Sequence, residues 1–168
     1  VYGSTRDHTL AVKALLSDGS SVTFSSLTNK EFNFKLKEDS LEGALYKQLY
    51  SELSDPQIRE QIELGYPKAS IFRRNTGYAV DALMSTSPFE AASEAFNFSK
   101  LICGSEGTLA FITELKLQIV PLPKPFQVVL NAHFSTINES LQATLVAMKM
   151  SPTACELMDK TILDCTKD

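Results

Sequence analysis

The sequence predicts an α+β fold in which a mostly antiparallel sheet is flanked by helices. Residues 10–16 alternate between two faces, an Asp-Gly pair follows, and residues 22–24 resume a strand pattern, which is typical of a β-hairpin. A second alternating stretch, residues 111–119, predicts a half-buried strand with Phe111, Thr113 and Leu115 on one face. Between these strands lie segments with the periodicity of helices.

Two helices are predicted in the middle of the chain. Leucines repeat every four residues from Leu41 to Leu53, and Ser40 is suited to cap this first helix. An Asp-Pro pair at residues 55–56 starts a second helix, because aspartate caps a helix and proline is tolerated at its first position. Residues 29–39 are polar with alternating apolar side chains, and we expect a short strand or a loop there.

The chain is predicted to divide near residue 122. Three prolines alternate over residues 121–125, and proline favours an extended path because it lacks a backbone donor. We therefore assign residues 1–122 to one domain and residues 123–168 to the beginning of another. The second part has the order strand, helix, strand, at residues 126–134, 137–148 and 154–158. This order indicates the opening of a ferredoxin-like α+β layer.

Composition excludes several function classes. A net charge of -4 and a pI near 5.2 argue against a nucleic-acid-binding surface. No apolar run reaches the roughly 18 residues of a membrane-spanning helix. The three cysteines form no metal-binding pattern and are expected to be free thiols in a reducing compartment. Neither His8 nor His133 has a partner motif, so we assign no catalytic residue and no metal ligand.

Gly104 and Gly107 bracket a Ser-Glu pair just before the strand at residues 111–119. Glycine lacks a Cβ atom, so the backbone can approach a ligand closely and present its N–H groups. Such groups bind phosphate oxygens or a polar ring edge. A tight turn that only feeds the strand is the alternative reading.

Residues 104–114, GSEGTLAFITE, resemble the GSEGTLGIITE signature of FAD-linked oxidases of the vanillyl-alcohol-oxidase type. D-lactate, glycolate and D-2-hydroxyglutarate dehydrogenases are members of this superfamily. Three further segments resemble the family in the same order, at residues 2–19, 74–81 and 152–159. The chain departs from the signature at Ala110, where the family usually has glycine.

The resemblance implies that residues 1–122 are the C-terminal part of a PCMH-type FAD-binding domain and that residues 123–168 begin the substrate domain. It also implies which residues contact the FAD: Tyr2, Gly3, Gly104, Ser105, Glu106, Gly107, Thr108, Leu109 and Ile112. The basic segment before Gly77 approaches the cofactor and substrate in the family, and it supplies the substrate candidates Arg73, Arg74 and Asn75. A guanidinium suits a carboxylate or a phosphate, although a solvated basic loop is the alternative.

The expected function is the oxidation of a D-2-hydroxyacid by hydride transfer to flavin, within a longer flavoprotein whose electrons pass to an acceptor. The expected cofactor is FAD, and an iron–sulfur cluster in a segment outside this chain is an open alternative. The chain alone is expected to be inactive, because its start lacks the family's pyrophosphate loop. A non-catalytic scaffold and an alcohol or sugar oxidase are the rival readings. The expected location is cytoplasmic, or peripheral to the inner face of a membrane.

Overall fold

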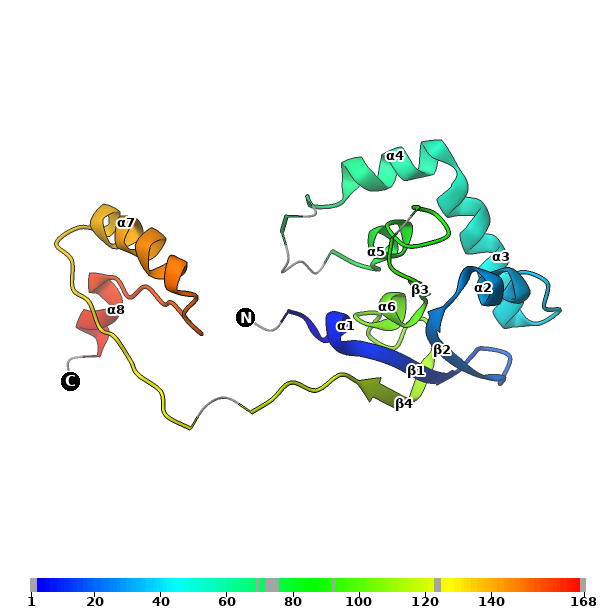
Figure 1. Ribbon diagram of the computed structural model, residues 1–168, viewed down its shortest axis with the longest axis horizontal. Coiled ribbons are helices and arrows are strands. Elements are labelled where there is room, and N and C mark those ends of the chain that lie inside the picture. Colours follow the sequence, from blue (N-terminus) through cyan, green and yellow to red (C-terminus); the bar gives the residue numbers. More distant parts are fainter. Residues whose placement is uncertain (1–2, 69, 72–75, 92, 123–124, 167–168) are drawn as a thin grey trace. The chain divides into compact units, whose positions relative to one another are not determined.

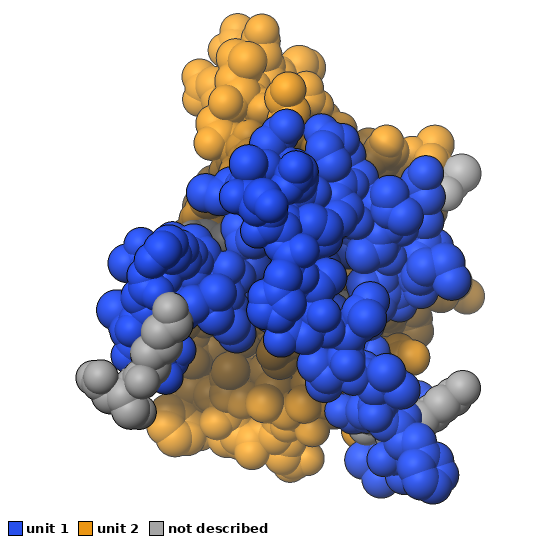
Figure 2. Space-filling model, turned by 90° about the vertical axis from the view of Figure 1, so that its left-hand side faces the viewer, with its two compact units in different colours: residues 1, 121–168 blue, residues 2–120 orange. Residues whose placement is uncertain are grey.

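The computed structural model describes residues 3–68, 70–71, 76–91, 93–122 and 125–166. The chain forms two compact units, Tyr2–Val120 and Pro121–Asp168, the second of which also includes Val1 (Figures 1 and 2). The first unit contains the elements α1 Thr5–His8, β1 Thr9–Leu15, β2 Ser21–Leu27, α2 Asn29–Lys35, α3 Leu41–Ser54, α4 Pro56–Gly65, α5 Val80–Met84, β3 Phe96–Asn97, α6 Ser99–Ile102 and β4 Phe111–Leu117. It is an α+β unit, as predicted.

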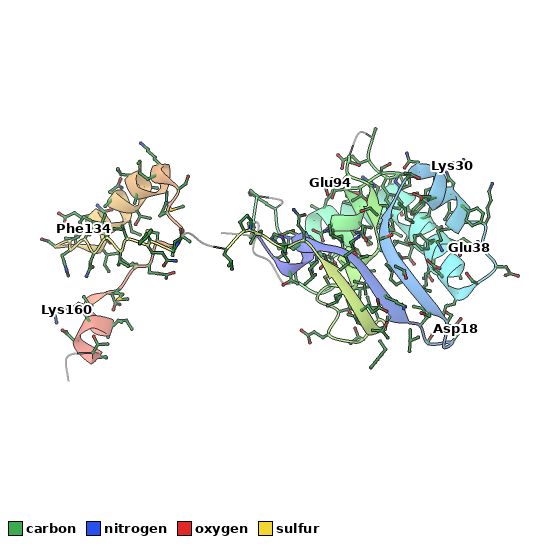
Figure 3. The ribbon with its side chains drawn as sticks, turned by 60° about the horizontal axis from the view of Figure 1, so that its bottom comes forward. Asp18, Lys30, Glu38, Glu94, Phe134 and Lys160 are labelled. Carbon is green, nitrogen blue, oxygen red and sulfur yellow. The ribbon has the colours of Figure 1, made fainter. Side chains whose placement is uncertain are left out.

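Four antiparallel strands form the sheet, in the order β3-β2-β1-β4. The predicted hairpin of β1 and β2 is confirmed, with Asp18 at its turn (Figure 3). Gly19 has a φ of 82°, a left-handed conformation that glycine adopts without steric cost. The Leu16 N–H donates to the Ser20 carbonyl at 2.9 Å, which closes the turn.

Strand β4 forms where alternation predicted it, but all of its residues are exposed, so the prediction of a half-buried strand is wrong. Its faces also differ from the prediction. Leu115 lies opposite Val12 and Ile112 lies opposite Ala14, so one extra residue, Thr113, separates the two pairs. This β-bulge shifts the alternation by one residue. Phe111 therefore lies opposite Leu15 on the other face from Leu115, and the prediction that Phe111 and Leu115 share a face is wrong.

Helices α2, α3, α5 and α6 lie on one face of the sheet, and Figure 3 shows the strands in front of the helices. Helix α4 contacts α3 and α5. The predicted helices are confirmed as α3 and α4. The hydroxyl of Ser40 accepts from the Gly43 N–H at 3.0 Å, and the carboxylate of Asp55 accepts from the Gln57 N–H at 2.8 Å. Both side chains thereby satisfy backbone donors that a helix start leaves without a partner.

Aromatic rings fill the core between the helices and the sheet. Phe32 is only 1% exposed and lies edge-on to Tyr46 and Phe96, with ring centroids 5.6 and 4.9 Å away. Phe24 stacks on Phe98 at 4.8 Å. Phe32 belongs to α2, so the expected strand or loop at residues 29–39 is corrected to a helix over its first part.

The second unit, residues 121–168, contains α7 Ile137–Ala147, a 3-10 turn η1 Met148–Met150 and α8 Lys160–Cys165. The helix predicted at residues 137–148 is confirmed as α7, and a capping box starts it: the Glu139 N–H donates to the Thr136 hydroxyl at 3.2 Å. The strands predicted at residues 126–134 and 154–158 are not formed. A strand requires a hydrogen-bonded neighbour, and the described residues of this unit provide none. Within the described residues, no helix has the length and apolar character needed to cross a membrane.

Candidate functional site

The turn between α6 and β4, residues 104–108, has an unusual backbone. Three of its residues adopt left-handed φ angles: Gly104 at 86°, Glu106 at 53° and Gly107 at 76°. Glycine occupies such conformations freely, whereas an L-residue such as Glu106 pays about 1–2 kcal/mol in steric repulsion. The turn is therefore held in this shape by its surroundings.

Thr108 closes the turn onto Ser105. Its N–H and its hydroxyl both donate to the Ser105 carbonyl, at 3.0 and 2.6 Å, so both lone pairs of that oxygen are used. Ser105 is buried, whereas Gly104, Glu106 and Gly107 are exposed. The N–H groups of these three exposed residues have no acceptor among the residues that the structure describes. The turn thus leaves backbone donors exposed on its surface.

The N-terminal segment is fixed against the base of this turn. Arg6 donates through Nε to the Lys100 carbonyl and through Nη2 to the Cys103 carbonyl, both at 3.1 Å. In return, Lys100 Nζ donates to the carbonyls of Arg6 and Asp7, at 2.7 and 3.2 Å. Helices α1 and α6 consequently lie side by side (Figure 1), although more than 90 residues separate them in the sequence.

Gly3 and Asp7 form a compact turn in that segment. Asp7 Oδ2 accepts from the Ser4 N–H at 2.6 Å and from the Ser4 hydroxyl at 2.9 Å. The Ser4 N–H holds the pKa of the Asp7 carboxyl below its ordinary value. Gly3 has a φ of 80°, and a Cβ atom there would lie 2.6 Å from Asp7 Oδ2. The backbone angle therefore favours glycine, and a Cβ atom at this position would displace the Asp7 carboxylate.

We expect Asp7→Asn to destabilise the chain at neutral pH but not in acid. A carboxyl with a lowered folded-state pKa stabilises fully above its unfolded-state pKa and loses that contribution as pH falls through the folded-state pKa. The difference in unfolding free energy between wild type and Asp7→Asn should shrink as urea titrations move from neutral pH to about pH 3. Ser4→Ala removes one of the two donors and should give a smaller pH-dependent loss. A difference independent of pH would contradict this account.

A third segment reaches the turn through Tyr78. The Tyr78 hydroxyl lies 2.7 Å from the Thr108 hydroxyl oxygen, and the Tyr66 hydroxyl donates to the Tyr78 carbonyl at 2.7 Å. Tyr78 is not among the residues that the sequence predicts at the site. The only signal for it in the sequence is its place in the segment Asn75–Tyr78, which carries part of the family resemblance.

The other expected site residues are placed as follows. Leu109 is partly exposed after the turn, and Ile112 lies on β4 opposite Ala14. Ala110, which departs from the family signature, joins the hydrophobic core, so its methyl group is accommodated. The expected residues Tyr2, Arg73, Arg74 and Asn75 lie outside the described part of the chain. Across the described ranges, no three His, Cys, Asp or Glu side chains gather as metal ligands would.

Comparison with known proteins identifies relatives over the whole chain. The chain is 29% identical over 168 residues to a D-2-hydroxyglutarate dehydrogenase of Pantoea ananatis (strain AJ13355) and equally to one of Escherichia coli (strain K12), and it covers 16% of the length of each. It is 27% identical over 162 residues to one of Pseudomonas putida (strain KT2440), of which it covers 15%. No family model and no solved structure matches the chain. The chain therefore spans about one sixth of these curated relatives and is similar to one segment of them, which confirms its resemblance to the FAD-linked oxidases.

Proposed function

We propose that this chain is part of an FAD-dependent dehydrogenase for a D-2-hydroxyacid and that residues 104–108 contact the flavin dinucleotide. The observation that supports this proposal is the exposed turn at residues 104–108. Three of its residues have left-handed φ angles, and three of its N–H groups have no acceptor among the described residues. The named relatives favour D-2-hydroxyglutarate as the substrate.

The donor set of the turn fits a flavin dinucleotide. Backbone N–H groups suit the carbonyl oxygens of a ring edge and the oxygens of a phosphate, and the two glycines allow close approach. Glu106 adds a negative charge that repels a phosphate. Its carboxylate suits the hydroxyl groups of a ribose or an amino group, because an ionised carboxylate only accepts hydrogen bonds. We therefore place a neutral, polar edge of FAD beside Glu106.

In this proposal the chain binds and positions, and when bound the flavin supplies the acceptor for the hydride from the substrate carbon. Gly104, Glu106 and Gly107 hold the dinucleotide through their backbone. Arg73 and Arg74 are proposed to bind the substrate carboxylate, since a guanidinium can engage it through two parallel hydrogen bonds. No described side chain is assigned to proton removal.

The two compact units correspond to two proposed domains with different roles. Residues 1–122 are proposed to complete an FAD-binding domain of the PCMH type, and residues 123–168 are proposed to begin the substrate domain. The change of unit between Val120 and Pro121 supports this division. The apolar side chains at Val128 and Leu130 are exposed in the second unit, which is expected of a segment whose partner strands lie elsewhere in a longer protein.

Gly107→Ala should lower the FAD affinity of the natural protein at its full length by about tenfold. An alanine at a φ of 76° carries about 1–2 kcal/mol of strain, which relaxes by turning the N–H groups away from their present directions. Gly19→Ala is a matched control, because Gly19 has a φ of 82°, and neither glycine has an atom within 4 Å of the added Cβ.

The measurements are flavin absorbance, FAD titration of the apoprotein, and turnover of D-2-hydroxyglutarate, D-lactate and glycolate. Gly19→Ala should lose stability without losing FAD affinity, since its turn joins β1 and β2. Equal FAD affinities for both variants would remove residues 104–108 from the cofactor site. A purified protein without bound flavin would refute the proposed function itself. Turnover of an alcohol or a sugar, without turnover of any 2-hydroxyacid, would show that the substrate is not a D-2-hydroxyacid.

A further inference from the structure

We propose that Tyr78 is a positioning residue whose phenol holds the turn 104–108 in its ligand-binding shape. The inference rests on the proposed function of that turn. It names a side chain that lies outside the turn and acts on it through Thr108, at an O–O distance of 2.7 Å.

The direction of this hydrogen bond follows from the number of protons. The Thr108 hydroxyl has one proton, and it donates that proton to the Ser105 carbonyl at 2.6 Å. In the contact with Tyr78 the Thr108 oxygen must therefore be the acceptor and the phenol the donor. The two bonds form a directed chain from Tyr78 through Thr108 to Ser105, and each bond in such a chain polarises the next.

Tyr78 is itself held at its backbone. Its carbonyl accepts from the Tyr66 hydroxyl at 2.7 Å and from the Val80 N–H at 2.9 Å, so both lone pairs of that oxygen are used. Tyr66 directly follows α4, and its own N–H donates to the Ile62 carbonyl of that helix. Tyr78 therefore connects the end of the 10-residue helix α4 to the turn, through its carbonyl on one side and its hydroxyl on the other.

Core packing does not explain this arrangement, because the Tyr78 side chain is largely on the surface. The residue is 43% exposed and lies outside the hydrophobic core. Its hydroxyl instead acts on a turn that contains a strained left-handed residue, Glu106, and that would relax to other conformations without a restraint. Removal of the hydroxyl should therefore loosen the turn without unfolding the protein.

The test uses Tyr78→Phe in the natural protein at its full length, with Tyr50→Phe as the control. Tyr50 is similarly exposed, at 40%, and its ring contacts Phe32, which belongs to the core, and Phe89, which packs against the core. Tyr78→Phe should speed amide hydrogen exchange at Ser105 and Thr108 several-fold and weaken FAD binding about 2- to 10-fold, the range expected for one hydrogen bond. The melting temperature should change no more than in Tyr50→Phe.

Variants at Thr108 separate positioning from general structure. Thr108→Val removes the acceptor for Tyr78 and also the hydrogen bond from the Thr108 hydroxyl to the Ser105 carbonyl, so its exchange and affinity changes should be at least as large as those of Tyr78→Phe. Adding Tyr78→Phe to Thr108→Val should change them little further. Thr108→Ser keeps the hydroxyl and should remain closer to wild type than Thr108→Val. Additive effects, or the same exchange rates and FAD affinity in Tyr78→Phe as in Tyr50→Phe, would overturn the inference.

The two proposals fail in different ways. A wild-type protein that binds no FAD refutes the proposed function, whereas the exchange measurement on the turn still decides whether Tyr78 restrains it. A wild-type protein that binds FAD and a Tyr78→Phe variant with wild-type affinity refute only the positioning role.

Discussion

Phe32→Ala should lower the free energy of unfolding by about 3–5 kcal/mol, the usual cost of deleting a buried phenyl ring. Phe32 is 1% exposed and contacts the rings of Tyr46, Phe89 and Phe96 at centroid distances of 5.6, 6.1 and 4.9 Å. These rings come from α3, from the loop before β3 and from β3 itself. The cavity left by the substitution would therefore separate three parts of the core at once.

The matched control is Phe34→Ala in the same helix. Phe34 is 67% exposed, so its loss removes little buried surface and should change stability by less than about 0.5 kcal/mol. Urea denaturation followed by circular dichroism measures both variants. Similar losses for the two substitutions would show that α2 does not anchor the core through Phe32.

Gly43→Ala should destabilise the chain by about 1–3 kcal/mol, the cost of forcing extra volume into a packed site. An added Cβ would lie 2.3 Å from the backbone oxygen of Glu38 and 3.0 Å from its carbonyl carbon. That carbonyl is held in place, because Lys47 Nζ donates to it at 3.0 Å. This expected loss of stability is opposite to the effect of helix propensity, which favours alanine over glycine by about 1 kcal/mol.

Gly65→Ala is the control for this second prediction. Gly65 ends α4, and an added Cβ there meets no atom within 4 Å. This substitution should leave stability unchanged or raise it, since alanine loses less backbone entropy on folding. Thermal and urea unfolding of the two variants test the contrast. A neutral Gly43→Ala would mean that the segment before α3 moves away at little cost.

Local signals predicted the hairpin, α3 and α4 because each depends on residues close in sequence. The same kind of signal was present for α2: the Thr28 N–H donates to Glu31 Oε2 at 2.8 Å, and the Glu31 N–H donates to the Thr28 hydroxyl at 3.3 Å. Alternation of apolar side chains masked this capping box. Phe32 is buried and Phe34 is exposed, so the alternating aromatic residues do not share a face.

Contacts between distant segments were beyond prediction. The β-bulge at Thr113 depends on how β4 pairs with β1, and the alternation of side chains within β4 alone does not predict it. For the candidate site, glycine spacing predicted the turn at residues 104–108. The hydrogen bond from Tyr78 to Thr108 joins residues 30 apart, and the bond from Arg6 to Cys103 joins residues 97 apart. No periodicity in the sequence encodes such pairs.

The position of β4 at the end of the sheet has a consequence for handling the protein. Its outer side has no neighbouring strand among the described residues, and Phe111 and Leu115 are 71% and 54% exposed. Free backbone groups beside apolar side chains are a template for strand addition between molecules. A preparation that leaves this strand uncovered is therefore prone to aggregate, and the charged side chains of Glu114 and Lys116 on β4 oppose it.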